Sequence, residues 1–262
     1  MGSTHDVSSH WPRVAHARAL PMKSAAKRVY KHVGVRALAA TKGQAGAFCV
    51  TLDDRELRTP ARQVLRLPTQ ELALGVAYEW EAQKKFIFPE TMPLMKLATT
   101  TIDQVPTIRP TMADSMLRCL ESDLTCFRSA EEPALCAKEE AAFGPLLSWS
   151  ADALSLRLGV TETMVLSHPP EAYPRAEQLL QEADDWELAA LDMAAGVTKS
   201  LVVALALAKN RIGAEEACRI ARVAEQHQID EWGEVEAGHD LDAADLAVRV
   251  GACSAFLRML GR

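Results

Sequence analysis

The residues of this chain that could do chemistry are concentrated in one acidic stretch, Gln228–Asp240, which also contains an indole and an imidazole. Glu231, Glu234 and Glu236 have no basic residue between them, so their carboxylates repel one another unless they face water or a cationic partner. Carboxylates beside an imidazole could serve acid/base catalysis, or they could bind Lys and Arg of another protein. Stretches of this kind are more often solvated turns than sites, so the elements that position these side chains decide between the interpretations.

Two amphipathic helices are predicted to position the acidic stretch. The residues of one helix face recur at spacings of three and four on each side of it: Ile220, Val223, Ala224 and His227 before, and Leu246, Val250, Cys253 and Leu257 after. This periodicity is typical of a helix with one buried face. The acids therefore lie at a junction between two helices, where Asp240 could cap the second helix through a side-chain oxygen.

We predict that Glu231, Glu234 and Glu236 are surface acids that bind a protein partner, because their mutual repulsion contributes nothing to folding. Lys or Arg side chains of that partner would supply the complementary charge. Trp232 has two possible roles, as the apolar centre of the contact or as a wedge that fixes the turn. His239 would likewise either contact the partner or hold the loop in place.

The familiar catalytic and metal-binding motifs are absent from the sequence. It contains no glycine-rich phosphate loop, no G-x-S-x-G elbow and no H-E-x-x-H pair. The nearest approach to a metal site, His227 with Glu231 and His239, matches no established ligand spacing, and His227 is better explained as a hydrogen-bonded core histidine. The six cysteines form no C-x-x-C pair and are expected to be reduced, mostly buried thiols. We therefore expect no metal, no cofactor, no small-molecule substrate and no catalytic site.

The charge of the chain is distributed unevenly. The net charge is −6, but the first 52 residues contain eight Lys or Arg and a single acid, Asp6, which leaves +7 there and −13 in the remainder. An acidic body is not expected to bind nucleic acid by neutralising phosphates. The basic leader, residues 1–26, is compatible with an organelle transit segment or with a disordered tail. The most apolar run, 201–208, is too short to span a membrane, so no membrane insertion is expected.

Strand patterns precede helix patterns along the chain, which predicts an α+β fold. Short stretches rich in β-branched and aromatic residues, at 29–35 and 47–52, predict β-hairpins. Beyond Pro110 helices are expected at 112–120, 138–158, 174–195, 197–210, 214–228 and 241–260. We therefore divide the chain into the basic leader (1–26), a small β-containing N-terminal domain (27–108) and a larger all-helical C-terminal domain (109–262).

One helix of the small domain, over about residues 70–84, carries a clear apolar stripe. Thr69 precedes the helix as a candidate N-cap. Leu72, Val76 and Trp80 follow one another at four-residue spacing, so we predict that these three residues anchor the helix to the core.

Several short motifs together resemble one protein family. They are LDDRELRTP at 52–60, EWEAQ at 79–83, MPL at 92–94, ESD at 121–123 with CFR at 126–128, and WGEVE at 232–236 with HD at 239–240. Their order and spacing resemble those of the mitochondrial ATP synthase assembly chaperones that bind the alpha subunit of the catalytic head (assembly factor two), over about residues 28–260. The resemblance implies a non-enzymatic factor of the mitochondrial matrix that keeps unassembled alpha subunits soluble until beta subunits replace it.

Two other classes of function are also compatible with the residues themselves. A small hydrolase or transferase could use the acidic turn around Trp232 to His239, and it would need a closed pocket with a perturbed acid or base. A regulatory binding module is the third alternative. A chaperone instead needs an exposed apolar patch ringed by charge, because it must cover a hydrophobic subunit surface and later release it.

Overall fold

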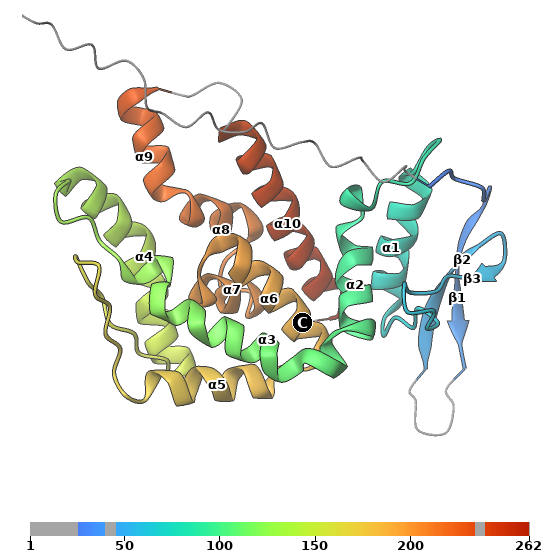
Figure 1. Ribbon diagram of the computed structural model, residues 1–262, viewed down its shortest axis with the longest axis horizontal. Coiled ribbons are helices and arrows are strands. Elements are labelled where there is room, and N and C mark those ends of the chain that lie inside the picture. The colour runs from blue at the N-terminus through green and yellow to red at the C-terminus, as the bar shows by residue number, and fades with distance from the viewer. Residues whose placement is uncertain (1–25, 40–45, 234–238, 262) are drawn as a thin grey trace, which may run out of the picture.

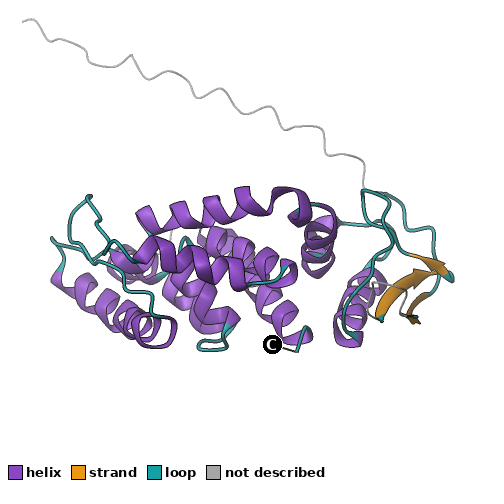
Figure 2. Cartoon of the chain, turned by 90° about the horizontal axis from the view of Figure 1, so that it is seen from below, coloured by secondary structure: helices purple, strands orange, loops and turns teal. Residues whose placement is uncertain are grey.

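The computed structural model describes residues 26–39, 46–233 and 239–261, with a small antiparallel sheet at one end and helices throughout the rest (Figure 1 and Figure 2). The strands come first in the chain and the long series of helices follows. The predicted α+β class is therefore confirmed. One continuous set of buried apolar side chains runs from the sheet into the helices.

Three strands form the sheet in the order in which they occur: β1 Val33–Leu38, β2 Ala47–Leu52 and β3 Arg55–Glu56. Asp53 and Asp54 connect the last two strands with φ angles of 47° and 66°, as a tight two-residue hairpin turn requires. The carboxylate of Asp53 also accepts hydrogen bonds from the backbone N–H groups of Lys31 and His32, and these bonds lower its pKa. One side chain thus joins the turn to the segment that enters β1.

Helix α1 (Gln70–Ala82) packs against the sheet and begins at the predicted cap. The hydroxyl oxygen of Thr69 accepts from the N–H of Leu72 at 3.3 Å, and the same hydroxyl donates to the carbonyl of Met259 at 2.6 Å. Because Met259 is the last residue of helix α10, the start of α1 is tied to the end of the chain. The predicted helix and its cap are confirmed.

The carboxylate of Glu79 joins α1 to helix α2 (Pro93–Asp103). Its two oxygens accept 2.7 Å hydrogen bonds from the N–H groups of Leu94 and Met95, in the first turn of α2. These N–H groups have no acceptor within their own helix. Glu79 is 8% exposed, and burial raises its pKa to about 7 although the two hydrogen bonds act to lower it.

The remaining helices build the larger part of the molecule: α3 Val105–Cys119, α4 Pro133–Leu154, α5 Ala172–Glu182, α6 Asp185–Thr198, α7 Leu201–Ala208, α8 Ala214–Ala221, α9 Val223–Trp232 and α10 His239–Met259. Short 3-10 turns lie at Pro89–Thr91, Leu120–Ser122 and Leu124–Cys126. In Figure 1, α6 and α7 occupy the centre, and α4 and α9 lie at the end farthest from the sheet.

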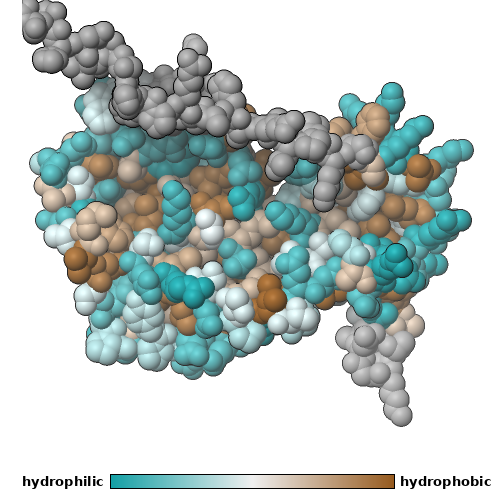
Figure 3. All heavy atoms as spheres, in the orientation of Figure 1, coloured by the Kyte–Doolittle hydropathy of each residue, from teal (hydrophilic) through white to brown (hydrophobic). Residues whose placement is uncertain are grey.

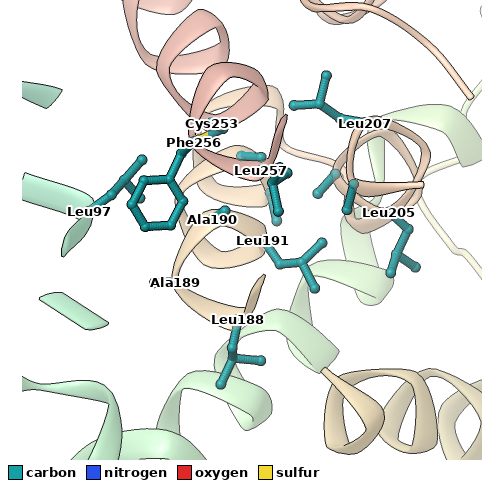
Figure 4. Close-up of a cluster of buried hydrophobic side chains, with 14 of the residues drawn as sticks. Leu97, Leu188, Ala189, Ala190, Leu191, Leu205, Leu207, Cys253, Phe256 and Leu257 are labelled. Carbon is teal, nitrogen blue, oxygen red and sulfur yellow. The ribbon is translucent and has the colours of Figure 1, made fainter. Parts of the chain in front are cut away.

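Helix α7 is apolar on every side, and each of its residues is 5% exposed or less. Such a helix is stable only when other elements enclose it. Helices α3, α4, α6, α8 and α10 pack around it. Figure 4 shows Leu205 and Leu207 of α7 close to Leu191 of α6, with Leu257 and Phe256 of α10 completing this part of the core.

The N-terminus of α7 is buried, so its free N–H groups need acceptors inside the protein. Asp123, which is fully buried, accepts from the N–H of Leu201 at 2.8 Å through one carboxylate oxygen. Its other oxygen accepts from the N–H of Thr125 at 3.0 Å, and the hydroxyl of Ser200 accepts from Val203 at 3.0 Å. Burial raises the pKa of Asp123. The loop after α3 is thereby fixed to the central helix.

The single helix predicted over 174–195 is wrong, because the chain breaks between α5 and α6. Asp184 caps α6 by accepting from the N–H groups of Trp186 and Glu187 at 3.0 and 2.9 Å. The guanidinium of Arg109 donates to the carbonyl of Leu180 near the end of α5. Both helix ends are thus satisfied by side chains at the break.

The break predicted at Gly196 is also wrong, since α6 continues through this residue to Thr198. The chain turns instead at Lys199, which has a left-handed φ of 55°. Ser200 then caps α7, so the cap rather than the glycine sets the boundary. Lys199 therefore lies at the end of α6 and not within a single buried helix over 197–210.

Helix α3 runs without interruption across the predicted boundary between residues 108 and 109, with Pro106 in its first turn and Pro110 inside it. The division into two domains stays a prediction. Residues 1–25 of the predicted leader lie outside the described residues. None of the helices in the described ranges has the length and hydropathy needed to cross a membrane.

Replacing Glu79 by Gln is expected to change how stability depends on pH. The pKa of this carboxyl is about 7 in the folded protein against an ordinary value of 4.5, so the folded state retains the proton as the pH rises. The contribution of Glu79 to the free energy of unfolding should therefore be greatest below about pH 4.5. It should decrease by about 3 kcal/mol as the pH rises to 7. Urea unfolding at a series of pH values should show that Glu79→Gln removes this decrease.

Glu81→Gln is the matched control, because Glu81 lies on the same helix with its side chain 59% exposed. The control should keep the pH dependence of the parent. An identical pH dependence in the Glu79 variant and the parent would contradict the assignment.

Candidate functional site

The end of α9 and the start of α10, between which the acidic stretch runs in the sequence, lie at the upper edge of the helical part as drawn in Figure 1. Glu231 and Trp232 form the last turn of α9 and both are exposed, with Trp232 at 73%. Gly233 follows with a φ of 84°, a conformation that favours glycine, and the chain leaves the helix axis there. An acid and a large aromatic residue therefore reach solvent together at this point.

The structure describes only part of the predicted partner-binding set. Glu234 and Glu236 lie outside the described residues. His239 is the first residue of α10, and its side chain also lies outside them. Because Trp232 is mostly exposed, the contact role fits the described structure better than the role of a packed wedge.

Acids at the end of α9 oppose the helix dipole, whose negative end is the C-terminus. Asp230 is compensated by Lys138 of α4, whose ammonium lies 2.9 Å from its carboxylate and lowers its pKa. Glu231 lies one residue further, exposed to solvent. Its position gives the helix no stability, which is the property expected of an acid that acts in a contact.

His227 holds α9 against α4 and is buried and hydrogen-bonded, as the sequence predicts for it. Its Nδ1 lies 3.2 Å from the ammonium of Lys138, and its Nε2 lies 3.0 Å from the carboxylate of Glu132. Since an ammonium can only donate, Nδ1 accepts and Nε2 carries the proton that is donated to Glu132. The chain of contacts from Glu132 through His227 and Lys138 to Asp230 fixes the end of α9 that leads into the acidic stretch.

A groove lies between α4 on one side and α8 and α9 on the other, with a cavity volume of about 440 Å³. We call it the α4/α9 groove. Half of its lining residues are apolar and most of the others are charged: Lys138, Ala141, Ala142, Pro145, Leu146, Arg211, Ile212, Glu216, Arg219, Ile220, Val223, Gln226, His227 and Asp230. Figure 3 shows apolar residues, in brown, gathered over this part of the molecule left of centre.

A second cavity, of about 320 Å³, lies beside α10 and is lined largely by charged residues. The charges pair with one another, since Arg222 lies 2.9 Å from Glu225 and Arg249 lies 3.3 Å from Asp245. Lys199 lines this cavity as an exposed residue. No nucleophile with an adjacent base occurs among the described residues of this cavity, which is the arrangement that covalent catalysis needs.

The three predicted anchors of α1 differ in burial. Leu72 and Val76 are fully buried, whereas Trp80 is half-buried against the core. The ring of Trp80 packs edge-on against Tyr30, with ring centroids 5.7 Å apart. The hydroxyl of Tyr30 donates to the carbonyl of Trp80 at 2.7 Å. The pair fixes the segment before β1 onto α1.

Metal ligands do not cluster in the described ranges, where no group of three or more His, Cys, Asp or Glu could hold an ion. The described cysteines are free thiols, and burial raises the pKa of Cys126 and of Cys253 to about 12. A thiol with so high a pKa is neither nucleophilic nor metal-binding at neutral pH.

The α4/α9 groove was not predicted from the sequence, although a signal for it exists. Ala141, Ala142 and Pro145 place two small side chains and a proline together on one face of α4. Pro145 has no N–H, so the carbonyl of Ala141 loses its helix hydrogen bond. Small residues and a free acceptor on a helix face indicate a surface that something else covers.

Comparison with known proteins finds relatives over most of the chain. Residues 27–151 match the family model described as ATP12 chaperone protein. The protein named atp12, mitochondrial, of Schizosaccharomyces pombe is 24% identical over 234 residues, which cover 84% of this chain and 80% of the relative. The crystal structure of Atp12 from Paracoccus denitrificans is 29% identical with a TM-score of 0.81, over 90% of this chain and 98% of that one. The Agrobacterium tumefaciens protein Atu1473, described as a candidate chaperone, is 33% identical with a TM-score of 0.79, over 90% of this chain and 85% of that one.

Alanine variants of Trp80 and Trp232 distinguish a tryptophan that stabilises the fold from one that is exposed to solvent. Trp80→Ala should lower the free energy of unfolding by about 2 to 3 kcal/mol, less than for a fully buried Trp, because the side chain is partly exposed and its buried N–H is unsatisfied. Trp232→Ala should change it by no more than about 0.5 kcal/mol, because the side chain is exposed. Chemical unfolding of both variants checks the pair, and equal stabilities would contradict the assignment of Trp80 as an anchor.

Proposed function

Because this chain belongs to the ATP12 chaperone family and is thus a chaperone of ATP synthase assembly, we propose that it binds the unassembled alpha subunit and prevents its aggregation until beta subunits replace it. The observation that carries the proposal is the agreement with Atp12 of Paracoccus denitrificans over 90% of the chain. Because 90% of the chain is covered, that agreement extends well beyond residues 27–151, which match the family model.

The surface chemistry supports a protein client. Trp232 and Glu231 combine an exposed aromatic face with negative charge, which suits a contact with an apolar patch that is flanked by Lys or Arg. We include Glu234, Glu236 and His239 in this contact on the basis of their sequence positions. Electrostatic complementarity of this kind sets encounter rate and register more than affinity.

We place this activity in the mitochondrial matrix. The Schizosaccharomyces pombe relative is named as mitochondrial, and the basic leader, residues 1–26, has the composition of a transit segment. The alpha subunit would be met there before it enters the catalytic head. Import of the full chain into isolated mitochondria, followed by fractionation, tests the location.

Charge reversal in the acidic stretch tests the proposed function. Glu234→Lys and Glu236→Lys should each reduce capture of purified alpha subunit, because they replace attraction by repulsion at the contact. Their melting temperatures should equal or slightly exceed that of the parent, because the substitutions relieve repulsion among the acids. Capture on an affinity resin and thermal unfolding are measured in parallel.

Glu162→Lys, at an exposed position of the loop between α4 and α5, is the matched control and should capture like the parent. Full capture by both acidic-stretch variants would remove this stretch from the contact. Failure of the parent itself to capture alpha subunit or to suppress its aggregation would refute the proposed function.

We also propose that the protein acts without nucleotide, metal or catalysis. The sequence has no phosphate loop, and no metal-ligand cluster occurs among the described residues. Isothermal titration of the full chain with ATP or with zinc should give no binding heat, whereas titration with alpha subunit should give a saturable one. Tight, stoichiometric binding of either small ligand would count against this part of the proposal.

A further inference from the structure

We propose that the α4/α9 groove binds an amphipathic helix of the client, one that carries apolar side chains on one face and a carboxylate beside them. This inference rests on the proposed function and adds to it the face that holds the client and the kind of client segment held there.

The floor of the groove is apolar and accessible. Leu146, Ile212 and Ile220 are buried at its base, and Ala141 and Pro145 are exposed along its side. The volume of about 440 Å³ lies within the range of sites that bury most of a bound ligand. An apolar floor rimmed by polar side chains is the arrangement found at protein–protein contacts.

The walls determine the conformation of the occupant. The walls are helices α4, α8 and α9, with Arg211 and Ile212 of the loop between α7 and α8 at one end. Apart from the carbonyl of Ala141, the helical walls satisfy their own backbone groups. They offer no strand edge, so an extended peptide would lose the hydration of its N–H and C=O groups without gaining partners. A helix carries its backbone hydrogen bonds with it and presents side chains at i, i+3, i+4 and i+7, which suit a groove.

The charges at the rim determine what lies beside the apolar face. Lys138 pairs with Asp230 at 2.9 Å and Arg219 with Glu216 at 3.7 Å. Arg211 is exposed and has no ion-pair partner among the described residues. Its guanidinium is therefore available for a carboxylate of the client helix, and a charge-assisted bond of this type is stronger than a neutral one.

The groove is continuous with the end of α9. Asp230 and His227 line the groove, and Glu231 and Trp232 follow directly on the same helix. One client can therefore occupy the groove and contact the exposed acids at the same time. The two contacts carry opposite charge, since Arg211 attracts a carboxylate and Glu231 attracts Lys or Arg, so together they also fix the direction of the client.

The basic leader of this chain is a less suitable occupant. Residues 1–26 contain Arg13, Arg18 and Lys23 against the single acid Asp6, and a positively charged segment is repelled by Arg211. A second copy of the chain would have to offer an acidic amphipathic helix whose apolar face is free. Among the described helices, the apolar faces pack into the chain's own core.

Filling the groove is the first test. Ala141→Trp places a large side chain on the exposed groove face of α4 and should raise the Kd for purified alpha subunit at least about tenfold. Ala153→Trp makes the same change at an exposed position of α4 that does not line the groove, and it should bind like the parent. Circular dichroism melting of the full chain shows whether either variant has lost its fold.

Charge reversal is the second test, and it does not depend on the packing of α4. Arg211→Glu should raise the Kd at least about tenfold, because attraction for the client carboxylate becomes repulsion. Arg157→Glu reverses an exposed arginine outside the groove and should leave the Kd unchanged. Normal binding by both Ala141→Trp and Arg211→Glu, with the parent binding alpha subunit, would overturn the groove proposal and leave the proposed function intact.

A photo-crosslinking residue at position 141 identifies the occupant. The crosslinked peptide should come from an acidic, helical segment of the alpha subunit. Crosslinks to residues 1–26 or to a second copy of the chain in the presence of excess alpha subunit would overturn the proposal. If the parent captures no alpha subunit at all, the proposed function fails first and the groove proposal fails with it.

Discussion

The enclosure of α7 is the constraint on which the helical part depends. A helix of eight apolar residues, none more than 5% exposed, cannot lie at any surface, so other helices must cover all of its faces. Its buried N-terminus also requires acceptors, and the carboxylate of Asp123 and the hydroxyl of Ser200 supply them. A fully buried carboxylate is costly unless it is well hydrogen-bonded. The loop after α3, the end of α6 and the start of α7 are therefore fixed relative to one another.

The α4/α9 groove follows from the shortness of α7. Leu146 of α4 is buried in the core that contains α7, whereas the first turns of α4 extend beyond it and face α9. Between these first turns of α4 and helix α9, polar contacts replace apolar packing. They run from Glu132 through His227 to Lys138 and Asp230. These contacts hold the helices at a fixed separation without filling the space between them. A groove with an apolar floor and a charged rim is the consequence.

The sequence predicts the fold class and several local features because these depend on neighbouring residues. The hairpin turn at Asp53, the cap at Thr69 and the apolar stripe of α1 are encoded within a few positions. The break at Asp184 is encoded just as locally, by an acid followed three residues later by Glu187, but the apolar pattern on both sides conceals it. The groove could not be predicted in this way, because its walls are residues 138–146 and 211–230, which only the tertiary fold brings together.

The same physical features suit a chaperone that must release its client. Exposed ion pairs contribute little net stability because water and salt compete for them, so the acids near Trp232 and the rim of the groove favour recognition over tight retention. The apolar floor adds contact area, but a contact that must be released has to bury less surface than permanent complexes do, which bury more than about 2,000 Å². On the function that we propose, a beta subunit that forms such an interface with the alpha subunit would displace this chain by mass action alone.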